Sequence, residues 1–133
     1  MDIAFLIGRI LFAALFLMSA MGHLTKSKDM GAYAGAKGVP VPVLATLASG
    51  VLILLGGLMV LLGVWGDLGA IFLVVFLVPT AVLMHGYWGE ADPMAKQMEM
   101  VQFNKDVALA GAALAFYWVF AHDPGLTITH SLF

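Results

Sequence analysis

Two histidines and a small set of charged and aromatic side chains are the residues of this chain best suited to chemistry. His23 follows one long apolar segment and His85 follows another. An imidazole changes its protonation state near neutral pH, so histidines in such places can donate or accept protons. The other candidates lie inside the first segment or near the ends of later ones: Arg9, Ser19, Tyr87, Trp88, Gln102, Lys105 and Asp106. We take these nine residues as the candidate ligand-binding set, with no catalytic residue identified.

The chemistry that such a set could perform is recognition of a polar head group at a membrane boundary. Gln102, Lys105 and Asp106 share one helical face through their offsets of three and four residues. Together with the histidines and aromatic rings, they could bind a quinone or another head group. The alternative interpretation is interfacial anchoring, because Tyr, Trp and Lys side chains are favoured at the membrane–water boundary.

Haem and metal ligation are weaker interpretations of the two histidines. The chain has no cysteine, so a cysteine-based haem-attachment motif is absent. No third ligand is evident beside the histidines. The sequence therefore predicts no metal site, does not favour haem and identifies no certain cofactor; a quinone is the possible ligand that it leaves open.

The composition decides which class of element positions these side chains. Apolar residues make up 62% of the 133 residues and charged residues only 11%, whereas soluble domains are about 45–50% apolar and about 25% charged. A soluble domain of this size cannot bury so much apolar surface. A soluble enzyme, a disordered chain and a nucleic-acid-binding protein, which would need a basic patch, are excluded. Without cysteine, disulfide scaffolds and thiol redox chemistry are excluded as well.

Four apolar stretches, at about 3–23, 43–65, 68–86 and 102–121, are the predicted elements. A spanning helix needs about 20 residues. The first three stretches satisfy this directly, and the fourth does so if its helix begins near Gln102. We therefore predict an all-α polytopic membrane protein, a single domain over residues 1–133 with four antiparallel transmembrane helices.

The two long connections are each predicted to carry a short helix on the membrane surface. In the first connection, Ser27 is the expected cap. In the second, Asp92 followed by Pro93 predicts a helix start, and Met94 and Met98 give that segment one apolar face. These interfacial helices are expected to be separate from the spans.

The distribution of positive charge predicts the orientation. Five lysines lie in or beside the two long connections: Lys26, Lys28, Lys37, Lys96 and Lys105. The other side has only Arg9. Because short cytoplasmic loops are enriched in lysine and arginine, both long loops are expected in the cytoplasm and both termini outside.

Arg9 is the one charge expected deep inside a span. The residues within about 80° of it on a helix of 3.6 residues per turn are Phe12, Phe16, Ser19 and His23. Because a charge in lipid costs several kcal/mol, this face is expected to point into the bundle, with Asp67 or Asp123 as the partner of Arg9. The alternative is that Arg9 reaches the outer interface and only anchors the helix. Small residues are expected to let the helices pack closely: Gly56, Gly57, Gly63, Ala108, Gly111, Ala112 and Ala115.

Several short motifs, in this order and spacing, resemble the DoxX family over nearly the whole chain. The first half of the pattern is Gly8-Arg9 with Leu11, Phe12 and Phe16, then Ser19–His23, then Gly38-Val39-Pro40-Val41-Pro42. The second half is Leu54-Leu55-Gly56-Gly57, then Met84-His85-Gly86-Tyr87-Trp88, then Lys105-Asp106-Val107-Ala108-Leu109-Ala110-Gly111. Two positions depart from the family pattern: Ile53 stands where a glutamate is frequent, which removes an acid suited to a proton relay, and Asp106 stands where asparagine is usual.

The resemblance implies a four-helix inner-membrane protein in contact with the lipid bilayer. The family includes a subunit of a thiosulfate:quinone oxidoreductase and members that resemble components of redox-stress complexes. It also looks related to eukaryotic membrane-protein assembly factors. The expected function is therefore a quinone-linked or accessory subunit of a membrane oxidoreductase, with membrane or redox proteins, or further copies of the chain, as partners. The alternative is an assembly or scaffolding module without redox activity.

Overall fold

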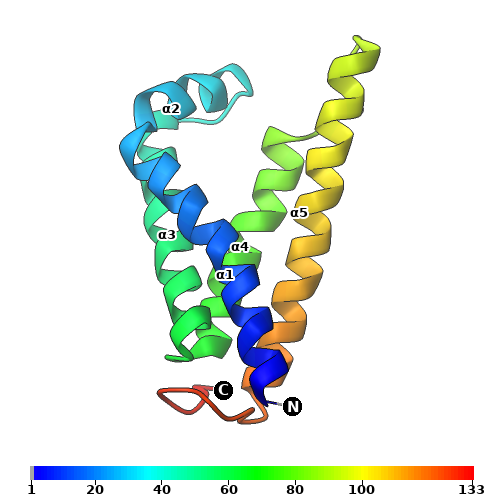
Figure 1. Cartoon of the computed structure of the whole chain (residues 1–133). Helices are drawn as coiled ribbons and strands as arrows, with labels where there is room; N and C mark the ends of the chain where they lie inside the picture. The colour runs from blue at the N-terminus through cyan, green and yellow to red at the C-terminus, as the bar shows by residue number, and fades with distance from the viewer. Residues whose placement is uncertain (1) are drawn as a thin grey trace.

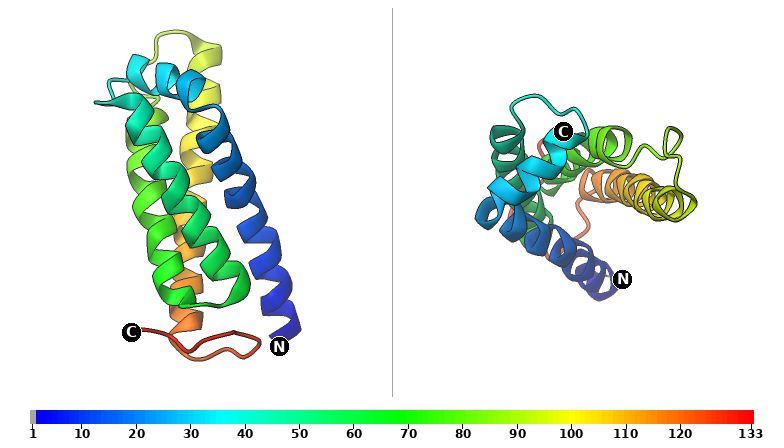
Figure 2. Two further views of the ribbon diagram at one scale, coloured as in Figure 1. Left: turned by 90° about the vertical axis from the view of Figure 1, so that its left-hand side faces the viewer. Right: turned by 90° about the horizontal axis from the view of Figure 1, so that it is seen from above.

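The computed structural model describes residues 2–133, and these residues form an all-helical bundle. The helices are α1 (Asp2–Thr25), α2 (Ser27–Ala36), α3 (Pro42–Leu62), α4 (Gly66–Met84) and α5 (Pro93–Phe120). In Figure 1, α1, α3, α4 and α5 run alongside one another, and α2 lies across one end. Both termini lie at the opposite end (Figures 1 and 2). We refer to these as the α2 end and the terminal end.

Three of the helices are long and apolar enough to cross a membrane. α1, α3 and α4 satisfy this criterion among the residues described, whereas α5 does not. Their bounds agree with the predicted stretches 3–23, 43–65 and 68–86 to within a few residues. Their surfaces carry exposed leucine, isoleucine and valine side chains, as expected for helices that face lipid. The molecule is a helical membrane protein.

α3 and α4 form a tight antiparallel pair, as the short connection between them predicts. α3 ends at Gly63, which has a φ of 65°, a left-handed conformation that glycine adopts without strain. Further along the pair, a Cβ atom added at Gly69 would lie 2.6 Å from the Cβ of Met59 and 3.1 Å from the carbonyl oxygen of Gly56. The two backbones can approach this closely only because Gly56 and Gly69 lack side chains.

The start of α5 corrects the prediction for the second long connection. Residues 93–100 do not form a separate interfacial helix; they are the first turns of one 28-residue helix. Asp92 is its N-cap and accepts a hydrogen bond from the Ala95 N–H at 2.8 Å, and Pro93 follows as the first helical residue. The start signals were therefore correct, but nothing between Pro93 and Gln102 ends the helix. At about 1.5 Å per residue, α5 is about 42 Å long.

α2 is the surface helix expected in the first connection, with one difference at its start. Lys26, not Ser27, is the N-cap residue, and it makes no side-chain capping hydrogen bond. The helix ends at Ala36, and Gly38 follows with a φ of 88°. α2 packs mainly against α3; a Cβ atom at Gly31 would lie 2.8 Å from a methyl group of Val43.

Arg9 is fully buried at the terminal end, and its partners are backbone carbonyls. Its side chain donates to Val60 O at 2.9 Å, to Leu61 O at 2.7 Å and to Leu126 O at 2.7 Å. Only 1% of its surface is exposed, so the interpretation of Arg9 as an interfacial anchor is wrong. The last carbonyls of a helix have no partner within it, and Arg9 supplies donors to two of them in α3.

The acidic partners predicted for Arg9 are also wrong. Asp67 accepts hydrogen bonds from the backbone N–H groups of Leu132 and Phe133, at 2.7 and 2.9 Å. Asp123 is exposed and lies 3.3 Å from a ring nitrogen of His130. The physical reason is that residues 121–133 fold back across the terminal end and occupy Asp67 themselves.

Aromatic side chains hold α1 and α5 together near the terminal end. The ring centroids of Phe5 and Phe120 are 5.2 Å apart, and those of Phe12 and Phe116 are 4.7 Å apart. Toward the α2 end the two helices diverge, as Figure 1 shows. The bundle is therefore closed at the terminal end and wider where the predicted site residues lie.

Candidate functional site

A cavity of about 830 Å³ lies toward the α2 end, and all five helices contribute to its wall. Most of the wall is apolar, with side chains such as Phe16, Leu52, Phe76 and Leu109. Its polar and charged lining residues are Ser19, His23, Lys26, Asp29, Tyr33, Thr46, Ser49, Thr80, His85, Lys105 and Asp106. A large apolar pocket with a few convergent polar groups is the usual form of a small-molecule site.

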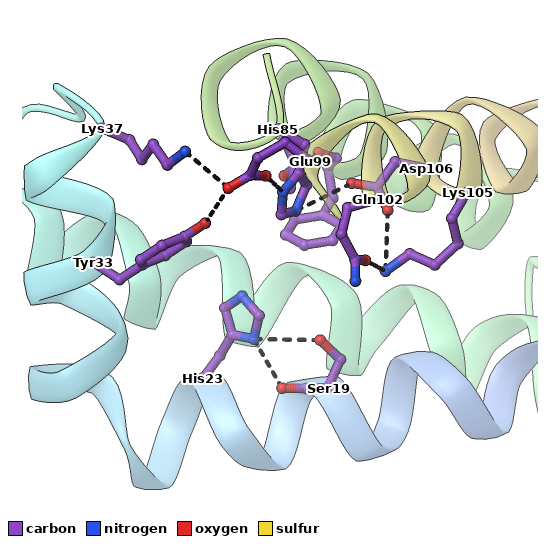
Figure 3. A network of polar contacts seen from close by, with 11 residues as sticks. Ser19, His23, Tyr33, Lys37, His85, Glu99, Gln102, Lys105 and Asp106 are labelled. Atoms are coloured by element: carbon purple, nitrogen blue, oxygen red, sulfur yellow. Dashed lines mark hydrogen bonds and ion pairs between the residues drawn. The ribbon is translucent and has the colours of Figure 1, made fainter. Parts of the chain in front are cut away.

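Glu99 of α5 joins three elements at the edge of this cavity. One carboxylate oxygen accepts hydrogen bonds from Tyr33 of α2 at 3.0 Å and from Lys37, the residue after α2, at 2.9 Å. The other oxygen lies 2.8 Å from Nδ1 of His85, which follows α4. Figure 3 shows this network. Burial raises the pKa of Glu99, but the hydrogen bonds from His85, Lys37 and Tyr33 outweigh it and lower the pKa to about 2.

Asp106 lies on the other side of His85 and is almost fully buried. Its Oδ2 is 3.8 Å from His85 Nε2, and its Oδ1 is 3.6 Å from the Lys105 ammonium. Both distances exceed a normal hydrogen bond. Lys105 instead donates to Gln102 at 2.6 Å. The carboxylate is 4% exposed, and no hydrogen bond to its Oδ2 is present among residues 2–133.

His23 reaches the cavity from α1. Its Nδ1 lies 2.8 Å from the backbone carbonyl of Ser19 and 3.4 Å from the hydroxyl of the same residue. A carbonyl oxygen only accepts, so Nδ1 carries the hydrogen and Nε2 of the neutral ring is an acceptor. The ring packs edge-on against Phe76 at 5.7 Å. In Figure 3 it points from α1 toward the elements that carry His85 and Asp106.

The structure brings together only part of the predicted ligand-binding set. Five of its members line the cavity: Ser19, His23, His85, Lys105 and Asp106. Arg9 is separated from them, at the terminal end. Tyr87 and Trp88 pack against Phe103, with ring centroids 5.5 and 5.8 Å away, and do not line the cavity. Gln102 contacts the site only through Lys105.

Three residues of the polar network were missed by the sequence interpretation: Glu99, Tyr33 and Lys37. One signal for Glu99 exists, because it precedes Asp106 by seven residues and so lies two turns away on the same face of a helix. Assigning residues 93–100 to a separate segment hid that spacing. Nothing local to Tyr33 or Lys37 indicates a contact with a residue more than 60 positions away.

The low pKa of Glu99 predicts a specific acid response of the fold. A carboxylate whose pKa falls from 4.5 to about 2 on folding contributes stability that is fully present above about pH 5 and is lost between about pH 4.5 and 2. Glu99→Gln is therefore expected to lower the melting temperature in detergent at pH 7, and the gap to wild type is expected to narrow on acidification through that window. Asp29→Asn removes an exposed carboxylate that makes no ion pair within residues 2–133, and is the control. A gap that stays constant down to pH 2 would contradict the assignment.

Comparisons with known proteins agree with this architecture. Residues 4–86, more than half of the chain, match the family model described as DoxX. Inner membrane protein YphA of Escherichia coli (strain K12) is 28% identical over 109 residues, which cover 82% of this chain and 77% of that protein. No solved structure gives a significant match. The apolar helices and the inner-membrane relative support a multi-pass location in the inner membrane, and the chain is a member of the DoxX family.

Proposed function

We propose that this DoxX-family protein is an accessory subunit of a membrane oxidoreductase or redox-stress system and binds a quinone-type molecule in its cavity. The observation that carries the proposal is the cavity itself, with apolar walls and, in its lining, two imidazoles and the buried carboxylate of Asp106. A quinone combines an apolar tail with a polar ring. The apolar wall of the cavity would contact the tail, and its polar side chains would contact the ring. The side chains that would face the ring are His23, His85 and Asp106, with Glu99 and Lys105 positioning them.

The proposal includes a topology of four spans. In it, the apolar part of α5, about residues 102–121, is the fourth span, and the polar turns before Gln102 extend beyond the hydrocarbon. The lysines of the long connections support an orientation with the α2 end in the cytoplasm and both termini outside. The polar part of the cavity then lies near the cytoplasmic boundary, at the depth where the head of an amphiphile resides.

The divergence of α1 from α5 supports entry of the ligand from the lipid. Leu15 and Ser19 of α1 and Leu109 of α5 line the cavity where these helices are apart. A lipid-soluble molecule would reach the site sideways, with its tail along the apolar wall. That route fits a quinone better than a water-soluble substrate.

The test is saturable binding of a short-chain benzoquinone or its benzoquinol to protein in nanodiscs. His23→Ala and His85→Ala are each expected to weaken binding at least about tenfold, a loss of about 1.4 kcal/mol. His122→Ala changes an exposed histidine at the terminal end and should leave the affinity unchanged. Wild-type affinity in both cavity variants, or no binding of either redox form, would refute the proposed site.

One observation favours the alternative, a scaffolding module without redox activity. Ala108, Gly111 and Ala115 form an exposed stripe of small residues along α5, and a Cβ atom at Gly111 would meet nothing within 4 Å. Such stripes allow close contact between helices in membranes. Gly56 and Gly57 are already covered within the chain, by Leu73 and Leu17. A protein that copurifies with a membrane partner and carries no extractable quinone would favour this alternative.

A further inference from the structure

We propose that the cavity prefers the reduced hydroquinone form of its ligand to the oxidised quinone. This inference rests on the proposed quinone-type ligand and adds its redox state. The basis is the inventory of hydrogen-bonding atoms inside the cavity: a buried carboxylate oxygen and an imidazole nitrogen are free to accept, whereas most of the wall hydroxyls already donate to the protein. A hydroquinone ring carries two hydroxyl donors, whereas a quinone ring carries only carbonyl acceptors.

Two acceptors at the polar part of the cavity lack a donor. Asp106 is 4% exposed, and its nearest donors, on Lys105 and His85, are 3.6 and 3.8 Å away. A buried carboxylate without hydrogen bonds is costly, so a ligand hydroxyl that satisfies it is favoured. His23 offers Nε2, because its Nδ1 donates to the carbonyl of Ser19. His85 lies between two carboxylates, with Nδ1 2.8 Å from Glu99 and Nε2 3.8 Å from Asp106, and is not counted among the free acceptors.

Four of the five hydroxyl groups of the wall have already donated their hydrogens to the protein, whereas the fifth, that of Ser19, lies 3.4 Å from Nδ1 of His23 and keeps its hydrogen. Thr46 donates to Pro42 O at 2.8 Å, Ser49 to Thr46 O at 2.9 Å, and Thr80 to Phe76 O at 2.7 Å. Tyr33 donates to Glu99. A hydroxyl that donates its one hydrogen retains only lone pairs for a ligand. These four groups therefore add further acceptors and no donors.

The remaining donors are the single hydroxyl of Ser19 and the ammonium groups of exposed residues. Lys26 and Lys105 line the cavity but are exposed, and Lys105 is already bonded to Gln102. Asp29 and Asp106 balance these two positive charges in the lining. A lining without net charge favours a neutral head group over an ammonium or a phosphate. A hydroquinone ring is uncharged and carries two hydroxyl donors, so it matches both the neutral lining and the free acceptors.

The experiment compares the two redox forms of one probe. A short-chain benzoquinol, kept reduced without oxygen, and its benzoquinone are titrated into the protein in nanodiscs in the same buffer. The wild type is expected to bind the quinol at least about tenfold more tightly. Asp106→Asn replaces an acceptor oxygen with a donor NH₂ of the same shape, so the preference is expected to fall to about twofold or less. His23→Phe keeps an aromatic ring without an acceptor and is expected to reduce the preference as well.

Asp123→Asn is the control, because it removes an exposed carboxylate at the terminal end, outside the cavity, and it should keep the wild-type preference. Equal affinities of the wild type for quinol and quinone would overturn this inference while leaving the proposed site intact. Binding of neither form would overturn both. A preference unchanged in Asp106→Asn and in His23→Phe would overturn the assignment of these acceptors.

Discussion

Arg9→Met is expected to lower the free energy of unfolding by about 3–9 kcal/mol, because three carbonyls would lose their donor at about 1–3 kcal/mol each. The carbonyls are those of Val60, Leu61 and Leu126. The methionine would keep much of the packing volume but supply no hydrogen bond. Residues 121–133 would also lose their tie to α1. Thermal unfolding in detergent should show a fall in melting temperature of at least about 10 °C, at a few degrees per kcal/mol.

Two further variants make this result specific to the guanidinium group. Arg9→Lys keeps the charge, but one ammonium cannot reproduce the planar fork that reaches three carbonyls, so an intermediate melting temperature is expected. Lys28→Met removes an exposed cation and should melt with the wild type. If Arg9→Met melts at the same temperature as Lys28→Met, Arg9 is not a structural tie.

The partners of Arg9 illustrate where the sequence stops being informative. Its burial followed from the cost of a charge in lipid, which any embedded arginine carries. Its partners did not follow, because backbone carbonyls carry no signature in the side-chain sequence. The segment after α5 has no helical periodicity. Its return across the terminal end, where its backbone N–H groups donate to Asp67, could therefore not be predicted from sequence patterns.

The spans were predictable because their signal is strong and local. Apolar runs of about 20 residues need no long-range information, and α1, α3 and α4 match them. α5 was divided wrongly because the charged residues between Pro93 and Lys105 lower the hydropathy without breaking the helix. The sequence does contain the signal for one continuous helix: Asp92–Pro93 is a strong helix start, and no glycine or proline follows it before Gly111.

The part of the candidate site that could be predicted is the part that follows from the direction in which each helix runs. Antiparallel helices place the residues after the first and third spans at one end, and His23 and His85 do line one cavity. The contacts of Glu99 with Tyr33 and Lys37 join α5 to α2 across more than 60 residues. Only the folded arrangement of the helices selects such pairs among all the polar residues near that end.

Gly69→Leu is expected to lower the free energy of unfolding by about 3 kcal/mol, the upper end of the range for overpacking. Even the first carbon of a side chain would lie 2.6 Å from Met59 Cβ and 3.1 Å from Gly56 O. The second contact is with backbone, which cannot rotate away, so α3 and α4 would have to separate. Thermal unfolding and the yield of monodisperse protein in detergent would measure the loss.

Gly111→Leu is the matched control, because a Cβ atom added there meets no atom within 4 Å and the substitution replaces a poor helix former with a good one. Its melting temperature should equal or exceed that of the wild type; equal melting temperatures of Gly69→Leu and Gly111→Leu would contradict the close α3–α4 contact.

The Gly111→Leu variant also separates the two proposed functions. If the small-residue stripe of α5 binds another helix, Gly111→Leu should abolish that association in the membrane while the isolated chain stays stable. If the cavity alone carries the function, the variant should bind the benzoquinol with wild-type affinity and keep its oligomeric state.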